Sequence, residues 1–502
     1  MISAFANMFK IPELRARVLF TLAIIVIVRV GSQITSPGVN VAVLHEYFLN
    51  ELNQKAGGSL AAMLNIFSGG ALENCAIFSL GIMPYISASI MLQLLTAVIP
   101  RLSKLAREDG GRQKIMQYTR YATLVLCIFQ GYLLALSFEN PNSNPFLSGI
   151  GDTIARLGMP LVSTPGLGFR LLTVITLTAG TMLLMWLGDQ ITDKGIGNGI
   201  SLIITVGIVA RLPAALIQAW RTFVPSGEQQ ASQVSPFVLV FMVAFLIIVI
   251  AAVISVTQAQ RKIAVQYAKR VIGRKVFSGQ TQYLPLKVNY AGVMPIIFAQ
   301  AILVFPSTII GLLFPNSPFA RQLASMLQSG WLHYALYGVM IFFFSYFWVA
   351  TQFQPTQIAE DLKKQGGYIP GQRPGKATAE FLEYTMTRLT FAGAIFLTII
   401  AILPEMIMTA LRVPYTTAQF FGGTSLLILV GVVLDTMRQI ETKLIDKQYD
   451  SFFRKAPSNR NRYAGGLSTR AEEQVQGTMI WVYVLVAIAV IIGVAYLVAI
   501  RH

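Results

Sequence analysis

Eleven long apolar runs constrain the fold of this chain more than any other feature of its sequence. They lie near residues 18–34, 76–99, 119–138, 169–188, 197–219, 236–256, 290–314, 332–352, 387–409, 420–437 and 478–499. A helix needs about 20 apolar residues to cross a bilayer. Hydrophobic residues also make up 54% of the 502 positions, a larger share than soluble domains contain. The sequence therefore predicts an all-α polytopic membrane protein with eleven spans.

The basic residues are distributed unevenly among the segments that join these runs. The chain carries 39 Lys and Arg against 22 Asp and Glu, a net charge of +17. If the N-terminus is cytoplasmic, 30 of the 39 fall in cytoplasmic segments. Cytoplasmic loops of membrane proteins are enriched in Lys and Arg, so this distribution predicts that orientation. By parity, an eleventh span then puts Arg501 and His502 on the outer side.

Residues 60–99 contain two apolar pieces of unequal length. The first, 60–67, is too short to span and is followed by Ser68-Gly69-Gly70, whereas the second, 76–99, is long enough but carries Gly81 and Pro84. Apolar half-helices joined by a glycine turn must be buried in protein or line a cavity, because lipid cannot satisfy the freed backbone groups. We expect the chain to enclose a pathway, with residues 60–74 as its stopper.

An internal repeat supports a central pathway. Gly81-Ile-Met-Pro84 is echoed by Gly292-Val-Met-Pro295, and residues 199–204 (GISLII) are echoed by 423–428 (GTSLLI). Each pair lies five spans apart, and an odd number of spans reverses direction, so two inverted five-helix halves are predicted, 1–225 and 226–450. Residues 451–502 would add a polar linker and one more helix. The register pairs Ile86 with Ile297 and Ile204 with Ile428, and these four would face one axis, with Ile82 and Ile200 one turn away.

Charged residues are scarce inside the runs. Arg29 and Arg211 lie toward outer ends and Asp435 near an inner end, and we interpret all three as snorkelling side chains. A solute transporter usually keeps titratable groups at mid-membrane, so this scarcity favours a different pathway, although an inverted-repeat secondary transporter remains the alternative. The neutral polar residues of the interior are Ser87, Gln93, Gln130 and Asn289, which either serve a gate or simply join helices by hydrogen bonds.

Two predicted cytoplasmic loops, 257–289 and 353–386, are long and basic. Six charges interleave with Tyr267 and aliphatic residues between Arg261 and Lys275, and Arg373 stands between Gly371 and Pro374, in a turn whose backbone is largely preset. Anionic lipid could attract such loops. Their length and the stiff turn favour a macromolecular partner.

No catalytic, metal or cofactor site is predicted. The three histidines, His45, His333 and His502, are scattered, and no phosphate-binding GxxxxGK[ST] motif is present. The two cysteines, Cys75 and Cys127, are interpreted as small apolar core residues. We therefore do not expect an enzyme.

The motifs SGGAL (68–72) and GIMPYISASI (81–90) resemble the SecY protein-translocation channel family, which includes Sec61α, and the resemblance extends from about Phe9 to Gln448. It implies a plug formed by Met63, Leu64, Asn65, Ile66, Phe67, Ser68, Gly69 and Gly70. It implies a pore ring formed by Ile82, Ile86, Ile200, Ile204, Ile297 and Ile428. It also implies a lateral gate between helices two/three and seven/eight, whose polar cluster is Ser87, Gln93, Gln130 and Asn289.

The same resemblance implies a function and partners. The chain would be the pore-forming subunit of a Sec translocon in the bacterial inner membrane, passing unfolded secretory proteins across and releasing membrane segments sideways. Small SecE- and SecG-type subunits, the SecA motor ATPase, the ribosome, signal sequences, nascent chains and lipid are the implied partners. The implied docking residues for the ribosome or SecA are Arg261, Lys262, Lys269, Arg270, Arg274, Lys275 and Arg373. Members usually end in a short basic tail, so the helix near 478–499 departs from the pattern.

Overall fold

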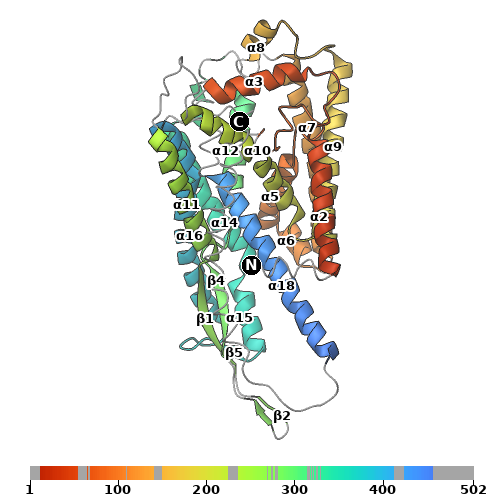
Figure 1. Cartoon of the computed structure of the whole chain (residues 1–502). Helices are drawn as coiled ribbons and strands as arrows, with labels where there is room; N and C mark the ends of the chain where they lie inside the picture. The colour runs from red at the N-terminus through yellow and green to blue at the C-terminus, as the bar shows by residue number, and fades with distance from the viewer. Residues whose placement is uncertain are drawn as a thin grey trace.

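The fold is a bundle of long helices with a small β-unit at one end (Figure 1). The computed structural model describes residues 12–54, 65, 68–108, 110–140, 150–223, 236–267, 281–313, 330–411 and 423–455, with short pieces between 270 and 277 and between 317 and 327. In the first part of the chain the helices are α2 (Pro12–Gly31), α3 (Val41–Gln54), α5 (Met83–Val98), α6 (Pro100–Arg107), α7 (Gly111–Glu139), α8 (Ile150–Leu157), α9 (Leu167–Lys194) and α10 (Gly199–Phe223).

The second part contributes helices and all of the described strands. The helices are α11 (Pro236–Gln258), α12 (Met294–Leu313), α14 (Trp331–Gln352), α15 (Pro355–Lys364), α16 (Lys376–Leu411) and α18 (Thr424–Lys455). The strands are β1 (Gln260–Tyr267), β2 (Arg270–Ile272), β3 (Lys275–Phe277), β4 (Thr281–Lys287) and β5 (Gly367–Tyr368).

Among the described residues, five helical stretches are long and apolar enough to cross a membrane. They are Gln113–Glu139, Leu167–Lys194, Gly199–Ile217, Trp331–Lys364 and Lys376–Pro404. The pair Met83–Thr96 and Pro100–Ala106 passes the same test only together, and it bends by 106°. Four further apolar runs are helical, as α2, α11, α12 and α18. The predicted eleventh span lies outside the described residues.

The second apolar run does not form one continuous span. Residues 71–82 follow an irregular path, and the helix α5 begins only at Met83. Gly81 adopts a positive φ of 58°, and Pro84 occupies the first turn of α5, where its missing N–H leaves no bond unmade. These two residues therefore fix where the helix starts. Ala76 instead pairs with Thr35 in an isolated antiparallel bridge.

The two basic loops form a β-unit, so the prediction of an all-α protein is wrong there. Strand β1 pairs antiparallel with β4 on one side and with β5 on the other, and β2 pairs with β3. In β1, Ile263 and Val265 are buried on one face whereas Gln266 is exposed, the alternation expected of a half-buried strand. The buried face packs with side chains of α14 and α16.

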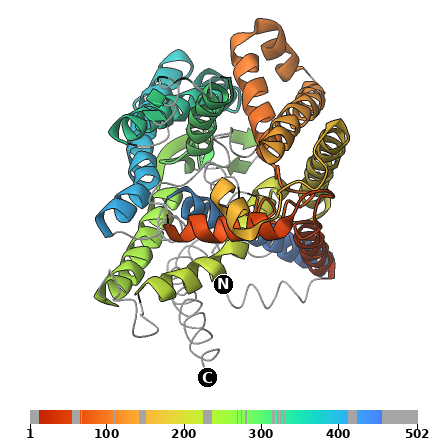
Figure 2. The same cartoon turned by 90° about the horizontal axis from the view of Figure 1, so that it is seen from above.

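Two hydrophobic cores meet near the middle of the bundle. We call them the N-core, built from α2, α9, α10 and residues 71–82, and the C-core, built mainly from α11, α12, α14, α16 and α18. Ile86, Leu202 and Ile204 pack against both cores. Seen from above, α5, α7 and α9 (orange to gold) and the helices α14 and α16 (teal and light blue) lie on opposite sides, while α3 (red) crosses between them (Figure 2).

Candidate functional site

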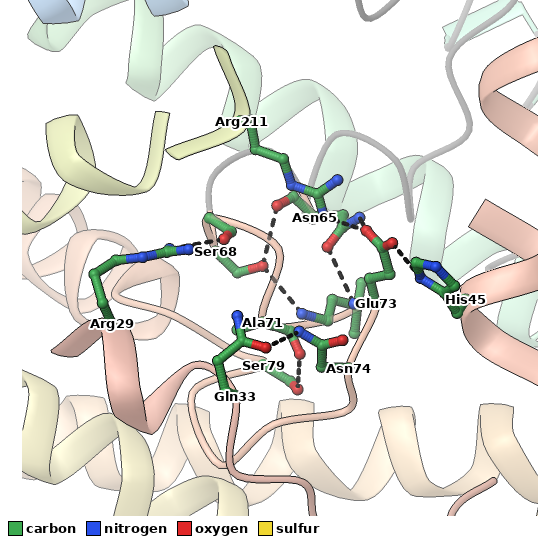
Figure 3. A network of polar contacts seen from close by, with 12 residues as sticks. Arg29, Gln33, His45, Asn65, Ser68, Ala71, Glu73, Asn74, Ser79 and Arg211 are labelled. Carbon is green, nitrogen blue, oxygen red and sulfur yellow. Dashed lines mark hydrogen bonds and ion pairs between the residues drawn. The ribbon is translucent and has the colours of Figure 1, made fainter. Parts of the chain in front are cut away.

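Half of the predicted plug residues are described. Asn65, Ser68, Gly69 and Gly70 are placed, whereas Met63, Leu64, Ile66 and Phe67 lie outside the described residues. We use the name plug segment for Asn65 together with residues 68–76. The polar contacts of this segment are drawn in Figure 3.

Side-chain and backbone hydrogen bonds fold the plug segment into a compact turn. The N–H of Gly70 donates to the carbonyl of Asn65 at 2.9 Å, and the N–H of Glu73 donates to the Asn65 side-chain oxygen at 3.1 Å. The hydroxyl of Ser68 donates to the Asn65 carbonyl and accepts from the N–H of Leu72, both at 3.3 Å. Gly69 and Gly70 have φ values of 66° and 90°, a region that side chains rarely adopt. The SGG sequence is therefore required by the turn itself.

The same turn is pressed against the backbone of α10. A Cβ added at Gly69 would lie 2.6 Å from the Cα of Gly207 and 3.2 Å from a guanidinium nitrogen of Arg29. A Cβ added at Gly70 would lie 2.9 Å from a nitrogen of Arg211. The absence of side chains at 69 and 70 is what lets the plug segment lie this close to α2 and α10.

Charged groups join the plug segment to three helices. The carboxylate of Glu73 pairs with Arg211 of α10 at 2.5 Å and with His45 of α3 at 2.7 Å, and it accepts from the Asn65 amide at 3.3 Å. Arg29 of α2 donates to the carbonyl of Gly69 at 3.0 Å. The side chains of Glu73 and Arg211 are only 12% and 16% exposed. The interpretation of Arg29 and Arg211 as snorkelling residues is therefore wrong, because both point inward onto the plug segment (Figure 3).

Apolar contacts hold the rest of the plug segment. Leu72 and Cys75 are buried in a cluster with Val43, Leu44 and Tyr47 of α3. Burial raises the pKa of the Cys75 thiol to about 12. Ala71 and Ala76 belong instead to the N-core. The plug segment is thus wedged between α3 on one side and the N-core on the other.

The six isoleucines of the predicted ring are distributed over the two cores. Ile82 is buried in the N-core and Ile297 and Ile428 in the C-core, while Ile86, Ile200 and Ile204 are half-buried beside them. Ile82 and Ile204 line a small cavity of about 30 Å³ together with Ser68 of the plug segment. That volume holds about one water molecule. The plug segment and two of the predicted ring residues therefore face the same small cavity.

The four predicted gate residues are not joined to one another. Asn289 is buried, Ser87, Gln93 and Gln130 are half-buried, and no hydrogen bond links any two of them in the described part of the chain. The Gln93 amide donates to Ser89 of its own helix at 3.3 Å, and its oxygen is buried without a partner. Ile86, Ile90 and Leu94 of α5 make the apolar part of its contact with the C-core.

The predicted docking residues are partly described. Arg261, Lys262 and Arg373 are exposed; the backbones of Arg270 and Lys275 belong to β2 and β3; Lys269 and Arg274 lie outside the described residues. Gly371 and Gly375, with φ values of 82° and 104°, flank Arg373, whose carbonyl accepts from the Thr378 hydroxyl at 2.8 Å. This bond and the two glycine turns hold Arg373 at a fixed place beside the start of α16.

Sequence reasoning missed Glu73 and His45 as site residues. Glu73 is the sole charged residue between positions 56 and 100, and Arg29 and Arg211 lie well inside apolar runs elsewhere. A lone carboxylate in an apolar stretch usually has a basic partner, so this pairing could have been proposed. Gln300 of α12 was also missed, and its side-chain oxygen, like that of Gln93 in α5, is buried without a hydrogen-bond partner in the described part of the chain.

Comparison with known proteins gives a consistent result. A family model described as SecY matches residues 76–437. The protein translocase subunit SecY of Aquifex aeolicus is 45% identical over 451 residues, covering 89% of this chain and 98% of that protein. The protein of the same name from Escherichia coli K12 is 43% identical over 449 residues, covering 88% and 95%.

Solved structures agree at the level of the fold. A protein-conducting channel superposes with a TM-score of 0.58 at 18% identity, covering 89% of this chain and 98% of that one. Sec61 in a canine ribosome-channel complex gives a TM-score of 0.56 at 18% identity, with the same coverage. The family model covers more than half of the chain, and the curated relatives match almost its whole length. The chain therefore belongs to the SecY family.

Proposed function

We propose that this protein is the pore-forming subunit of a membrane translocase that conducts unfolded secretory polypeptides through its centre. One observation carries the proposal: a glycine-rich segment is docked beside Ile82 of the N-core and beside Ile204, which packs against both cores. A ring of six isoleucines would suit a polypeptide pore, because an apolar constriction excludes water and ions yet offers no charge that would hold a passing chain. The names of the curated relatives do not favour a secondary transporter of a small solute.

The proposed architecture has two inverted five-helix halves, residues 1–225 and 226–450, followed by a linker and an eleventh span in 451–502. The repeated Gly/Pro motifs support the inversion. Gly81 and Gly292 have similar positive φ values, 58° and 64°, just before α5 and α12. In this topology the protein lies in the bacterial inner membrane with a cytoplasmic N-terminus and an external C-terminus.

A lateral opening is proposed between α5/α7 and α12/α14. Helix α5 contacts α7 and α12, and α12 contacts α14. The seam along Ile86, Ile90 and Leu94 contains no ion pair or hydrogen bond in the described residues, so its separation breaks apolar contacts only. Ser87, Gln93, Gln130 and Asn289 would then tune how readily signal sequences separate these helices.

We propose that the β-unit docks the ribosome or the SecA motor. Arg261, Lys262 and Arg373 are exposed there, and contact with ribosomal RNA would be dominated by phosphate and sensitive to salt. Among the structural neighbours, canine Sec61 is in a ribosome-channel complex and a yeast Ssh1 complex is bound to the 80S ribosome. SecE- and SecG-type subunits would complete the assembly. The energy for transport would come from the ribosome or the SecA motor.

Site-directed crosslinking tests the pore. A photoreactive residue is placed at position 86, 204, 297 or 428 while a secretory chain is stalled during transport. We expect adducts from all four positions and none from Val125 or Ile175, two exposed positions on the outside of α7 and α9. Adducts from the control positions alone would refute a central pathway.

A further inference from the structure

We propose that Glu73 and Arg211 are plug-positioning residues, whose ion pair sets the fraction of channels in which the plug segment is docked. This inference rests on the proposed function, since it assumes that the plug segment leaves its place during transport. It adds a specific electrostatic hold to the glycine contacts and the apolar contacts described above.

Glu73 is placed as the counterion of Arg211, and Arg29 contacts the same segment through a backbone carbonyl. The carboxylate of Glu73 pairs with Arg211 at 2.5 Å, and Arg29 reaches the neighbouring carbonyl of Gly69 at 3.0 Å. A Cβ added at Gly69 would lie 3.2 Å from a guanidinium nitrogen of Arg29, and one added at Gly70 would lie 2.9 Å from a nitrogen of Arg211, so the two like charges approach adjacent residues of the segment. When the plug segment leaves, both arginines lose their partners and face each other without a carboxylate. The electrostatic energy therefore favours the docked state.

Burial makes this preference larger than that of a surface ion pair. The side chains of Glu73 and Arg211 are 12% and 16% exposed, so water screens their interaction poorly. Removing one partner of such a pair leaves the other charge buried without compensation, which costs far more than breaking an exposed pair. Each single substitution should thus shift the docking equilibrium.

The contacts also predict an order among the variants. Glu73→Gln leaves the buried Arg211 without its carboxylate partner, whereas Arg211→Gln leaves Glu73 with His45 and Asn65 as partners. We therefore expect Glu73→Gln to release the plug segment more than Arg211→Gln does. Glu73→Gln keeps the length of the side chain and its capacity for hydrogen bonds, so packing changes little there, whereas Arg211→Gln shortens the side chain, as the control Arg120→Gln also does.

The native Cys75 reports on docking. It is fully buried beside Leu72 in the cluster with α3. Only the thiolate reacts with maleimides, so a buried thiol with a raised pKa stays inert until the segment opens. With N-ethylmaleimide and full-length protein in membranes, in a Cys127→Ala background, the labelling rate then measures the undocked fraction.

We expect Arg211→Gln to raise the labelling rate about tenfold and Glu73→Gln to raise it more. Arg120→Gln is the matched control, because it breaks a 2.7 Å pair with Asp189 that joins α7 to α9. It should leave Cys75 labelling unchanged. The exchanged pair Glu73→Arg with Arg211→Glu should restore part of the slow labelling.

The inference is overturned if Cys75 is labelled no faster in Arg211→Gln and Glu73→Gln than in Arg120→Gln. It is also overturned if the rate increase in the exchanged pair equals the product of the increases caused by Glu73→Arg and Arg211→Glu alone. Should Arg211→Gln fail to accumulate, Glu73→Gln removes the same ion pair from the plug side without altering a helix. Labelling needs no transported substrate. Failure of the crosslinking experiment would therefore refute the proposed function, whereas unchanged labelling would refute this inference alone.

Discussion

The glycine turn of the plug segment gives the sharpest quantitative prediction. Gly69 has a φ of 66°, and placing an L-residue there costs about 1–2 kcal/mol. That strain is relieved when the segment undocks and its backbone relaxes. A tenfold change in an equilibrium corresponds to about 1.4 kcal/mol, so strain alone should raise the undocked fraction about five- to thirtyfold in Gly69→Ala. The contact with the Cα of Gly207, at 2.6 Å, adds to this because neither backbone can yield easily.

The assay is again the alkylation rate of Cys75 in a Cys127→Ala background. Gly158→Ala is a close control, because Gly158 has a φ of 62° but no atom within 4 Å of an added Cβ. This variant carries the same backbone strain without touching the plug segment. Its Cys75 should label at the parental rate. If Gly69→Ala and Gly158→Ala label equally fast, the close approach of the plug segment to α10 does not control docking.

Two further predictions concern the pore and the β-unit. Ile428→Asn places an amide in the buried C-core at the proposed ring, which would let water into the constriction. We expect the resting protein to show a raised ion conductance in planar bilayers. A conductance equal to that of the parent protein would argue against an apolar seal. Arg373→Glu reverses an exposed charge in a turn that is held by the hydrogen bond from the Thr378 hydroxyl to the carbonyl of residue 373. We expect normal accumulation and insertion but blocked translocation, measured by export of a secretory reporter. Undiminished export would remove the coupling role of Arg373.

The helical framework could be predicted well from the sequence because a long apolar run is stable in lipid only as a helix. Ten of the eleven runs contain a described helix. The start of α5 was placed seven residues too early, because residues 76–82 are as apolar as the helix that follows them. A hydropathy profile indicates which residues are buried but not which backbone conformation they adopt. The positive φ of Gly81 and the pairing of Ala76 with Thr35 are the features that decide the local path.

The β-unit and the charged contacts could not be read from local patterns. Strand β1 has only two buried residues, Ile263 and Val265, on its inner face, and its second partner strand, β5, lies about a hundred residues later. Arg211 and Glu73 are 138 residues apart in the chain. A hydropathy profile shows each as an isolated charge, for which snorkelling is the ordinary explanation. A basic partner for Glu73 could be expected from the sequence, but the tertiary arrangement is what shows that this partner is Arg211.

The two kinds of contact around the plug segment have different consequences for a seal that must open and close. Leu72 and Cys75 are held by apolar burial, which is insensitive to small displacements until the cluster separates. The Glu73–Arg211 pair depends on direct contact, and exposure of this pair to water weakens it sharply. A passing chain that brings water to the constriction would therefore weaken the electrostatic hold first. The apolar contacts with α3 would then guide the segment back when the chain has left, since they need no exact alignment of charges.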